Sequence, residues 1–130
     1  MNLSCLLSLM KELPSYAQLV RQVSAEWEGK AVILDAAKPY LIAALYEQLG
    51  LPIMVIIAQP RDARKLYEQL QVWCSPSANV YYFPELDFHS YDSVALYHSN
   101  TVVERLQTLS TLAFEQDIRE PPLIVASLPA

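Results

Sequence analysis

The spacing of apolar and polar positions changes about 30 residues into the chain. Before that point, residues 3–11 and 15–27 carry apolar side chains at helical intervals, and Pro14 separates the two segments. We expect two helices here, with Ser15 as the N-cap of the second. After that point, short apolar runs alternate with helical segments, a pattern that is typical of βαβ units and a parallel sheet.

The alternation gives an expected position for each later element. Strands are expected at residues 31–35, 53–58, 80–83 and 123–127, and helices at residues 39–49, 60–73 and 99–115. The first two strands are apolar at consecutive positions, as expected of central strands that helices cover on both faces. Pro39 and Pro60 stand at predicted helix starts, where an N–H has no intrahelical partner, and Gly50 is a predicted helix stop. Because no helix follows the last strand, we expect a fragment of a longer protein.

The turn after the first predicted strand is the place where an α/β nucleotide-binding fold carries its phosphate site. Here it consists of Asp35, Ala36, Ala37, Lys38 and Pro39. The turn has no glycine and no GK[ST] sequence, Asp35 adds a negative charge, and Pro39 removes a backbone donor. The chain contains only Gly29 and Gly50, so no other segment can form a P-loop. We predict a degenerate phosphate loop that neither binds nor hydrolyses ATP.

One alternative for this turn stays open. Lys38 lies near a predicted helix start and could in principle contact a phosphate, although we favour a solvated lysine beside Asp35. Asp35 also ends a predicted strand, as the phosphorylated aspartate of a receiver-like module would, but no other acids lie near it in sequence.

Charge and cysteine content narrow the classes of partner. Nine basic and fourteen acidic residues give a net charge of −5, and no cluster of cations suggests a surface for the nucleic-acid backbone. Cys5 and Cys74 lack metal or redox spacing, so we expect reduced thiols that pack as small apolar residues in a cytoplasmic protein. The longest apolar run, residues 51–58, is much shorter than the ~20 residues of a membrane-spanning helix, and no membrane partner is expected.

The remaining candidates have simpler explanations. His89 and His98 lie among acids, but their spacing matches no metal-ligand motif, so we expect polar loop residues and no metal. No serine has a GxSxG context, and no catalytic residue is predicted. The aromatic residues of 81–97 lack the accompanying cations of a base-stacking surface. Arg64 and its neighbours indicate a solvated helix of mixed charge, and the apolar stripe of residues 99–115 is expected to pack in the core.

The sequence FPELDFHSYD at residues 83–92, followed by SNTVVERLQTL at 99–109, resembles the amino-terminal, UvrB-like region of the bacterial transcription-repair coupling factor family, Mfd. The matching motif positions are Pro84, Glu85, Tyr91, Asp92, Arg105, Leu106 and Leu109. The opening sequence LLSLMKELP is also similar to the short leading helices of that family. Members have a degenerate phosphate loop where UvrB has an intact Walker sequence, in agreement with residues 35–39 here.

The resemblance implies a RecA-like, P-loop-NTPase-like parallel sheet, with a helical lead-in at residues 1–28 and a truncated subdomain at 29–130. It implies a non-catalytic scaffold in a parent protein that is an ATP-dependent DNA translocase, displaces stalled RNA polymerase and recruits UvrA. Its implied partners are UvrA and the other domains of the parent, with RNA polymerase and DNA reached through the full-length protein. ATP and Mg belong to the downstream motor, and this chain carries no cofactor. The alternative is the nucleotide-binding domain of a UvrB-like or other superfamily 2 helicase; a flavodoxin-like or receiver-like module fits less well.

Overall fold

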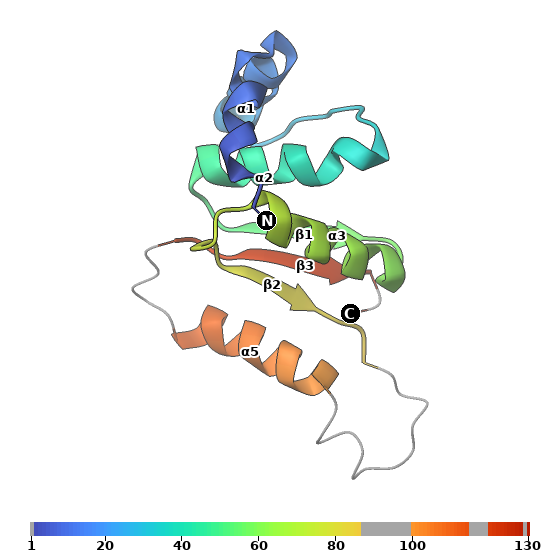
Figure 1. The fold of residues 1–130 in the computed structure, drawn as a ribbon. Helices are drawn as coiled ribbons and strands as arrows, with labels where there is room; N and C mark the ends of the chain where they lie inside the picture. Colours follow the sequence, from blue (N-terminus) through green and yellow to red (C-terminus); the bar gives the residue numbers. More distant parts are fainter. Residues whose placement is uncertain (1, 87–99, 115–119, 129) are drawn as a thin grey trace. The chain divides into compact units, whose positions relative to one another are not determined.

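The computed structural model describes residues 2–86, 100–114, 120–128 and 130 (Figure 1). Contacts between residues divide the chain into two units. The first comprises Met1–Gly50 and Gln69–Pro76, and the second comprises Leu51–Glu68 and Ser77–Ala130. The helix α3 (Pro60–Trp73) contributes residues to both units.

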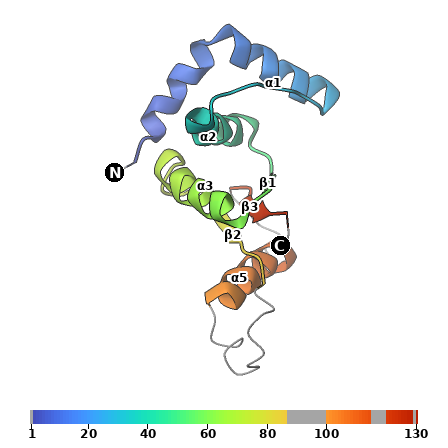
Figure 2. The ribbon, with the colours of Figure 1, turned by 90° about the vertical axis from the view of Figure 1, so that its right-hand side faces the viewer.

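The first unit opens with the 3₁₀ helix η1 (Ser4–Glu12) and the α-helix α1 (Pro14–Glu26). In η1 the residues Leu7 and Met10 are buried, because positions three apart lie on the same side of a 3₁₀ helix. Figure 2 shows η1 and α1 meeting at an angle, close to α2. The predicted cap at Ser15 is wrong: Pro14 takes the first helical position, and Leu13 is the N-cap without a side-chain hydrogen bond.

The helix α2 (Lys38–Leu49) follows a single 3₁₀ turn, η2 (Asp35–Ala37). Gly50 ends α2 with a φ of 58°, so the predicted stop is confirmed. Within the first unit, Tyr40 of α2 donates a hydrogen bond of 2.7 Å to the carbonyl of Leu6. Its ring also packs against Trp73, with the ring centroids 4.8 Å apart.

The predicted strand at residues 31–35 is absent. Residues 31–34 have no regular secondary structure, and Val32 and Leu34 are 97% and 81% exposed. A strand exists only when another strand pairs with its backbone. The described part of the first unit contains no strand. The apolar run at residues 31–35 favours an extended backbone, but an extended backbone forms a strand only if another strand pairs with it.

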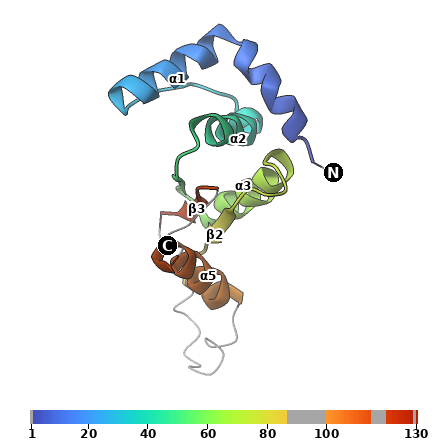
Figure 3. The same ribbon diagram turned by 90° about the vertical axis from the view of Figure 1, so that its left-hand side faces the viewer.

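The second unit contains a three-stranded parallel sheet in the order β1-β3-β2. Its strands are β1 (Ile53–Ile57), β2 (Val80–Phe83) and β3 (Leu123–Ser127). The connections from β1 to β2 and from β2 to β3 cross the sheet in opposite directions. Right-handed crossovers then place their helices on opposite faces, and Figures 2 and 3 show α3 and α5 (Asn100–Phe114) on the two sides of the sheet. The chain is therefore a mixed α/β protein with a small parallel sheet flanked by helices.

The buried strand of this sheet is β3, and β1 is an edge strand. All five residues of β3 are buried, whereas Met54 and Ile56 of β1 are 59% and 62% exposed. The expectation that residues 53–58 form a central strand was wrong, since β3 inserts between β1 and β2. The predicted positions of β2, β3 and α3 are confirmed.

The helix α5 turns a polar residue toward the sheet. Thr108 is 1% exposed, and its hydroxyl donates a 3.0 Å hydrogen bond to the carbonyl of Glu104. The apolar stripe expected in the core is instead largely exposed, at Val103, Leu106, Leu109 and Leu112. The correction has a simple cause: α5 packs mainly along β2, which is itself at an edge, so only a narrow face of the helix is covered.

The two cysteines have different environments. Cys74 is buried and Cys5 is exposed, and neither forms a disulfide. The expectation of apolar packing holds for Cys74 alone. Burial raises the pKa of the Cys74 thiol to about 11, with the nearby Glu47 carboxylate adding to the effect.

Candidate functional site

Two backbone N–H groups of the turn at residues 35–39, those of Ala37 and Lys38, already donate hydrogen bonds within the chain. The N–H of Ala37 donates to the carbonyl of Leu34 at 2.9 Å, and the N–H of Lys38 donates to the carbonyl of Asp35. Pro39 has no N–H. A phosphate loop depends on successive N–H groups that point at the anion. None of the three positions 37–39 therefore has a backbone N–H group that is free to bind an anion.

The side chains of the same turn also disfavour the binding of an anion. The ammonium of Lys38 lies 2.6 Å from the carboxylate of Asp35, and the two side chains are 49% and 92% exposed. This pair matches the expectation of a solvated lysine beside Asp35. Ala36 is exposed and offers no polar side chain. A phosphate at Lys38 would have to displace a carboxylate that is covalently tethered three residues away.

The first strand of the sheet is followed by a different turn, Ala58, Gln59 and Pro60. This turn also lacks glycine, and its Gln59 carbonyl accepts the first described hydrogen bond of α3, from the N–H of Ala63 at 3.0 Å. Both turns that could be compared with a phosphate loop therefore lack the residue type that lets a backbone approach a phosphate.

Two of the motif positions, Pro84 and Arg105, meet at the carboxyl end of β2. The Nη1 of Arg105 donates a 2.6 Å hydrogen bond to the carbonyl of Pro84. Its guanidinium carbon lies 4.0 Å from the centre of the Phe83 ring. A helix residue thus holds the chain where it leaves the sheet, across a sequence separation of 21 residues. Glu85 is exposed immediately beyond this contact.

The other motif positions are not brought into this contact. Leu106 and Leu109 lie on the exposed side of α5, at 60% and 48% exposure. Tyr91 and Asp92 lie outside the described residues, as do His89 and His98. The structure therefore groups Pro84 with Arg105 and presents the two leucines on a separate, open surface.

A second cluster was missed by the sequence analysis. Arg64 of α3 donates a 3.0 Å hydrogen bond to the Glu104 carboxylate of α5 and lies 3.4 Å from the carboxylate of Glu68. Its guanidinium carbon is 5.1 Å from the centre of the Tyr82 ring, and that ring stacks on Tyr67 at 5.5 Å. The expected solvated helix face thus has one arginine that links α3, β2 and α5. Only the Arg64–Glu68 spacing of four residues could have signalled it.

This cluster changes the acid–base properties of its members. The hydrogen bond that Arg64 donates to the Glu104 carboxylate is the main cause that raises the pKa of Arg64, and Glu68 adds to it. Burial raises the pKa of the Tyr82 phenol, while Arg64 acts in the opposite direction. Both groups therefore keep their protons at neutral pH. The arrangement of Arg64, Tyr82 and Glu104 links α3, β2 and α5.

Metal and membrane chemistry gain no support from the described residues. Within residues 2–86, 100–114, 120–128 and 130, no group of three potential metal ligands comes together. In the same part of the chain, every helix is too short or too polar to cross a membrane.

No protein family, curated protein or solved structure was found to match this chain.

Proposed function

We propose that the chain is a non-catalytic, RecA-like and UvrB-like scaffold subdomain of a bacterial transcription-repair coupling factor. The parent protein would be an ATP-dependent DNA translocase that removes stalled RNA polymerase and recruits UvrA. The observation that carries the proposal is the occupied turn at residues 35–39. The N–H groups of Ala37 and Lys38 donate to neighbouring carbonyls, and the Lys38 ammonium is paired with the Asp35 carboxylate.

The motif segment supports the same proposal from another part of the chain. The residues that resemble the coupling factors include Pro84 and Arg105, which are in direct contact. They also include Leu106 and Leu109, which are exposed apolar residues on α5. A scaffold needs both features: a contact that fixes its own loop, and an apolar surface for a neighbouring domain.

The competing proposal is the nucleotide-binding domain of a UvrB-like or other superfamily 2 helicase. It requires Lys38 to leave Asp35 and contact a phosphate. Calorimetric titration with Mg-ATP and Mg-ADP separates the two proposals. We expect no saturable heat. Saturable binding that Lys38→Ala abolishes, and that the matched control Lys65→Ala preserves, would overturn the scaffold proposal.

A second measurement asks for a positive result. The chain is immobilised and exposed to the translocase motor of a coupling factor that lacks its own amino-terminal region. We expect binding that weakens at least about tenfold, or 1.4 kcal/mol, when Leu106 and Leu109 are both changed to serine. The control Leu9→Ser removes a leucine that is 54% exposed in the first unit and should leave binding unchanged. Absence of binding, or equal losses in both variants, contradicts the proposal.

A further inference from the structure

The face of the sheet on which α5 lies can be followed from β2 to β1. The guanidinium of Arg105 in α5 lies 4.0 Å from the centre of the Phe83 ring, which marks this face on β2. Phe83 and Ile56 both pair with Ala126 of β3, and side chains of paired residues lie on the same face of a sheet. Ile56 is therefore on the α5 face, as is Met54 two residues earlier.

This face is covered over β2 and open over β1. The helix α5 packs along β2, whereas β1 has its main contacts with β3, and Met54 and Ile56 are more than half exposed. The strand β3 separates β1 from β2. Because neighbouring strands lie about 4.8 Å apart, the space over β1 is about 9.6 Å from α5, close to the distance of about 8–10 Å between two packed helices. The open part of the face therefore has the width of one helix.

The composition of α5 is that of a helix covered on more than one side. Of its 15 residues only Glu104 and Arg105 are charged. Glu104 binds Arg64 and Arg105 binds the Pro84 carbonyl, so both charges are engaged within the same chain. By contrast, α3 carries five charged residues among 14, as a helix with a solvated face does. The outer side of α5, which has no charge, is typical of a surface that contacts protein.

Large apolar residues occupy this uncharged surface of α5. Each is between 47% and 60% exposed: Val103, Leu106, Leu109 and Leu112. At 3.6 residues per turn, the first two lie on the side of the helix opposite Thr108, which is buried against the sheet. The last two lie on the flank away from Glu104, which reaches α3 past the outer edge of β2. That flank therefore faces the open space over β1.

One copy of the chain thus has both a helix with an uncovered apolar side and a sheet face with room for one helix. A twofold axis parallel to α5 places the helix of each protomer between its own β2 and the β1 of its partner. We propose that the chain forms this twofold dimer, in which Leu106 of each protomer packs on Met54 and Ile56 of the other and the two α5 flanks meet. Because β1 has no charged residue either, the contact buries no unpaired charge.

The exposed apolar area sets the strength of this dimer. A homodimer interface of about 1,000 Å² that is about 65% apolar needs about 55 Å² of apolar area from each of the twelve residues that the two protomers contribute. Full burial of a leucine-sized side chain removes about 60–120 Å². Residues that are 47–62% exposed therefore supply about 30–75 Å² each. The interface lies near the lower limit for a stable dimer, and we expect a dissociation constant of about 10 µM.

The test is sedimentation velocity of the full chain over concentrations from about 1 to 200 µM, which span the expected dissociation constant. Ile56→Lys and Leu106→Glu each bury a charge in the contact and should each weaken dimerisation at least about tenfold. An equimolar mixture of the two variants should dimerise again. In that heterodimer one of the two symmetric contacts keeps its original residues, and the other joins the introduced ammonium to the introduced carboxylate.

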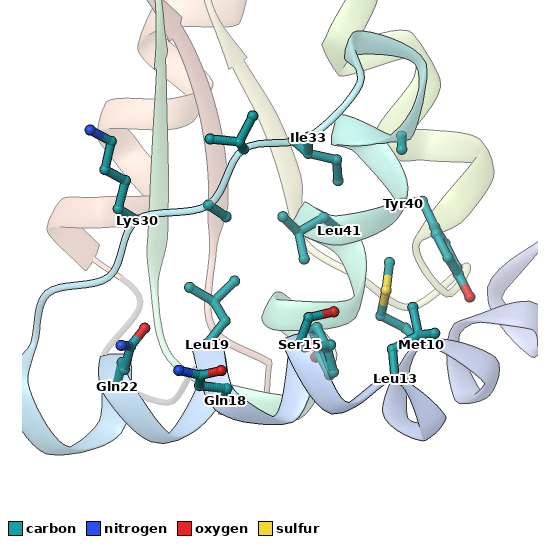
Figure 4. Close-up of a pocket in the computed structure, with 14 residues that line it drawn as sticks. Met10, Leu13, Ser15, Gln18, Leu19, Gln22, Lys30, Ile33, Tyr40 and Leu41 are labelled. Atoms are coloured by element: carbon teal, nitrogen blue, oxygen red, sulfur yellow. The ribbon is translucent and has the colours of Figure 1, made fainter.

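The control Leu13→Glu makes the same change of charge as Leu106→Glu. Leu13 is 48% exposed and lines an open groove of the first unit, between α1, α2 and the segment 30–33 (Figure 4). This variant should dimerise as the wild type does. Circular dichroism shows whether each variant is folded, and Met54→Lys replaces Ile56→Lys if the latter is not.

Three results would each overturn the dimer: a wild type that stays monomeric, an equal loss in Leu13→Glu, or a mixture of the two variants that does not associate. The motor domain of the proposed function would use Leu106 and Leu109, so it competes with the second copy for them. Its binding is measured with a different partner, so a monomeric chain would leave the scaffold proposal standing.

Discussion

Arg105 should contribute more to stability than its place on a helix surface suggests. It donates a 2.6 Å hydrogen bond to the Pro84 carbonyl and covers the Phe83 ring at 4.0 Å. The change Arg105→Ala removes both interactions. Alanine is the best helix former, so any loss of stability cannot be attributed to helix propensity within α5.

The size of the loss follows from these two contacts. A hydrogen bond from a charged donor contributes about 1.5–3 kcal/mol, and a cation–π contact at a partly exposed site contributes about 0.5–1 kcal/mol. Arg105 is only half-buried, so the lower ends apply, and helix propensity returns a few tenths of a kcal/mol. We expect a net loss of about 2 kcal/mol. Arg105→Lys should lose about half as much, because an ammonium can reach the carbonyl but cannot stack as a planar group.

Urea unfolding followed by circular dichroism measures this difference. A loss of about 2 kcal/mol lowers the urea midpoint by about 1 M for an m-value of about 2 kcal/mol/M. Arg61→Ala, at an exposed position in the first turn of α3, is the control and should change stability by less than about 0.5 kcal/mol. The reasoning fails if Arg105→Ala behaves like this control, or if Arg105→Lys is as damaging as alanine.

Three further predictions concern buried or crowded groups. Burial raises the pKa of Cys74 from 9.0 to about 11, so its stabilising effect is complete below about pH 9. Unfolding free energy should then fall as pH rises toward about 11, and Cys74→Ala should reduce that slope in urea titrations at stepped pH. Gly29→Ala places a methyl group within 3.0 Å of Val23 and Leu19. This crowding should cost about 1–2 kcal/mol and lower the thermal unfolding midpoint by several degrees. An unchanged midpoint would refute the close approach. Ser127 is 3% exposed and its hydroxyl has no hydrogen-bond partner among the described residues. Ser127→Ala should therefore leave the unfolding free energy unchanged or raise it by up to about 1 kcal/mol. A clear loss of stability in the same urea assay would reveal a missed hydrogen bond.

The sequence pattern predicted the positions of helices and strands correctly where the local sequence alone determines the backbone conformation. Pro60 at the start of α3 and Gly50 after α2 mark boundaries through backbone geometry alone. The pattern failed at residues 31–34, because an extended apolar segment becomes a strand only with a pairing partner. It also misplaced β1 as a central strand, because the order of strands depends on which segment arrives between them.

The features of the candidate site that depend on local sequence were predictable, and the contacts between distant residues were not. The absence of glycine at residues 35–39 can be read from composition, and hydrogen bonds of the turn add a second obstacle to phosphate binding. The contact of Arg105 with Pro84 could not be derived from spacing, because 21 residues and a helix separate the partners. The link from Arg64 to Glu104 spans 40 residues, and only the fold brings these two side chains of α3 and α5 together.

The position of β3 in the sheet has a consequence for the order of folding. Among the residues that the structure describes, the strands β1 and β2 each pair with β3 and not with each other, although β3 is the last of the three to be synthesised. The sheet therefore cannot begin to form until a ribosome has released residues 123–127, which lie more than 60 residues after β1. Long-range parallel pairing of this kind is slow. During translation, β1 stays without a strand partner, and its apolar residues are open to chaperones or to wrong partners.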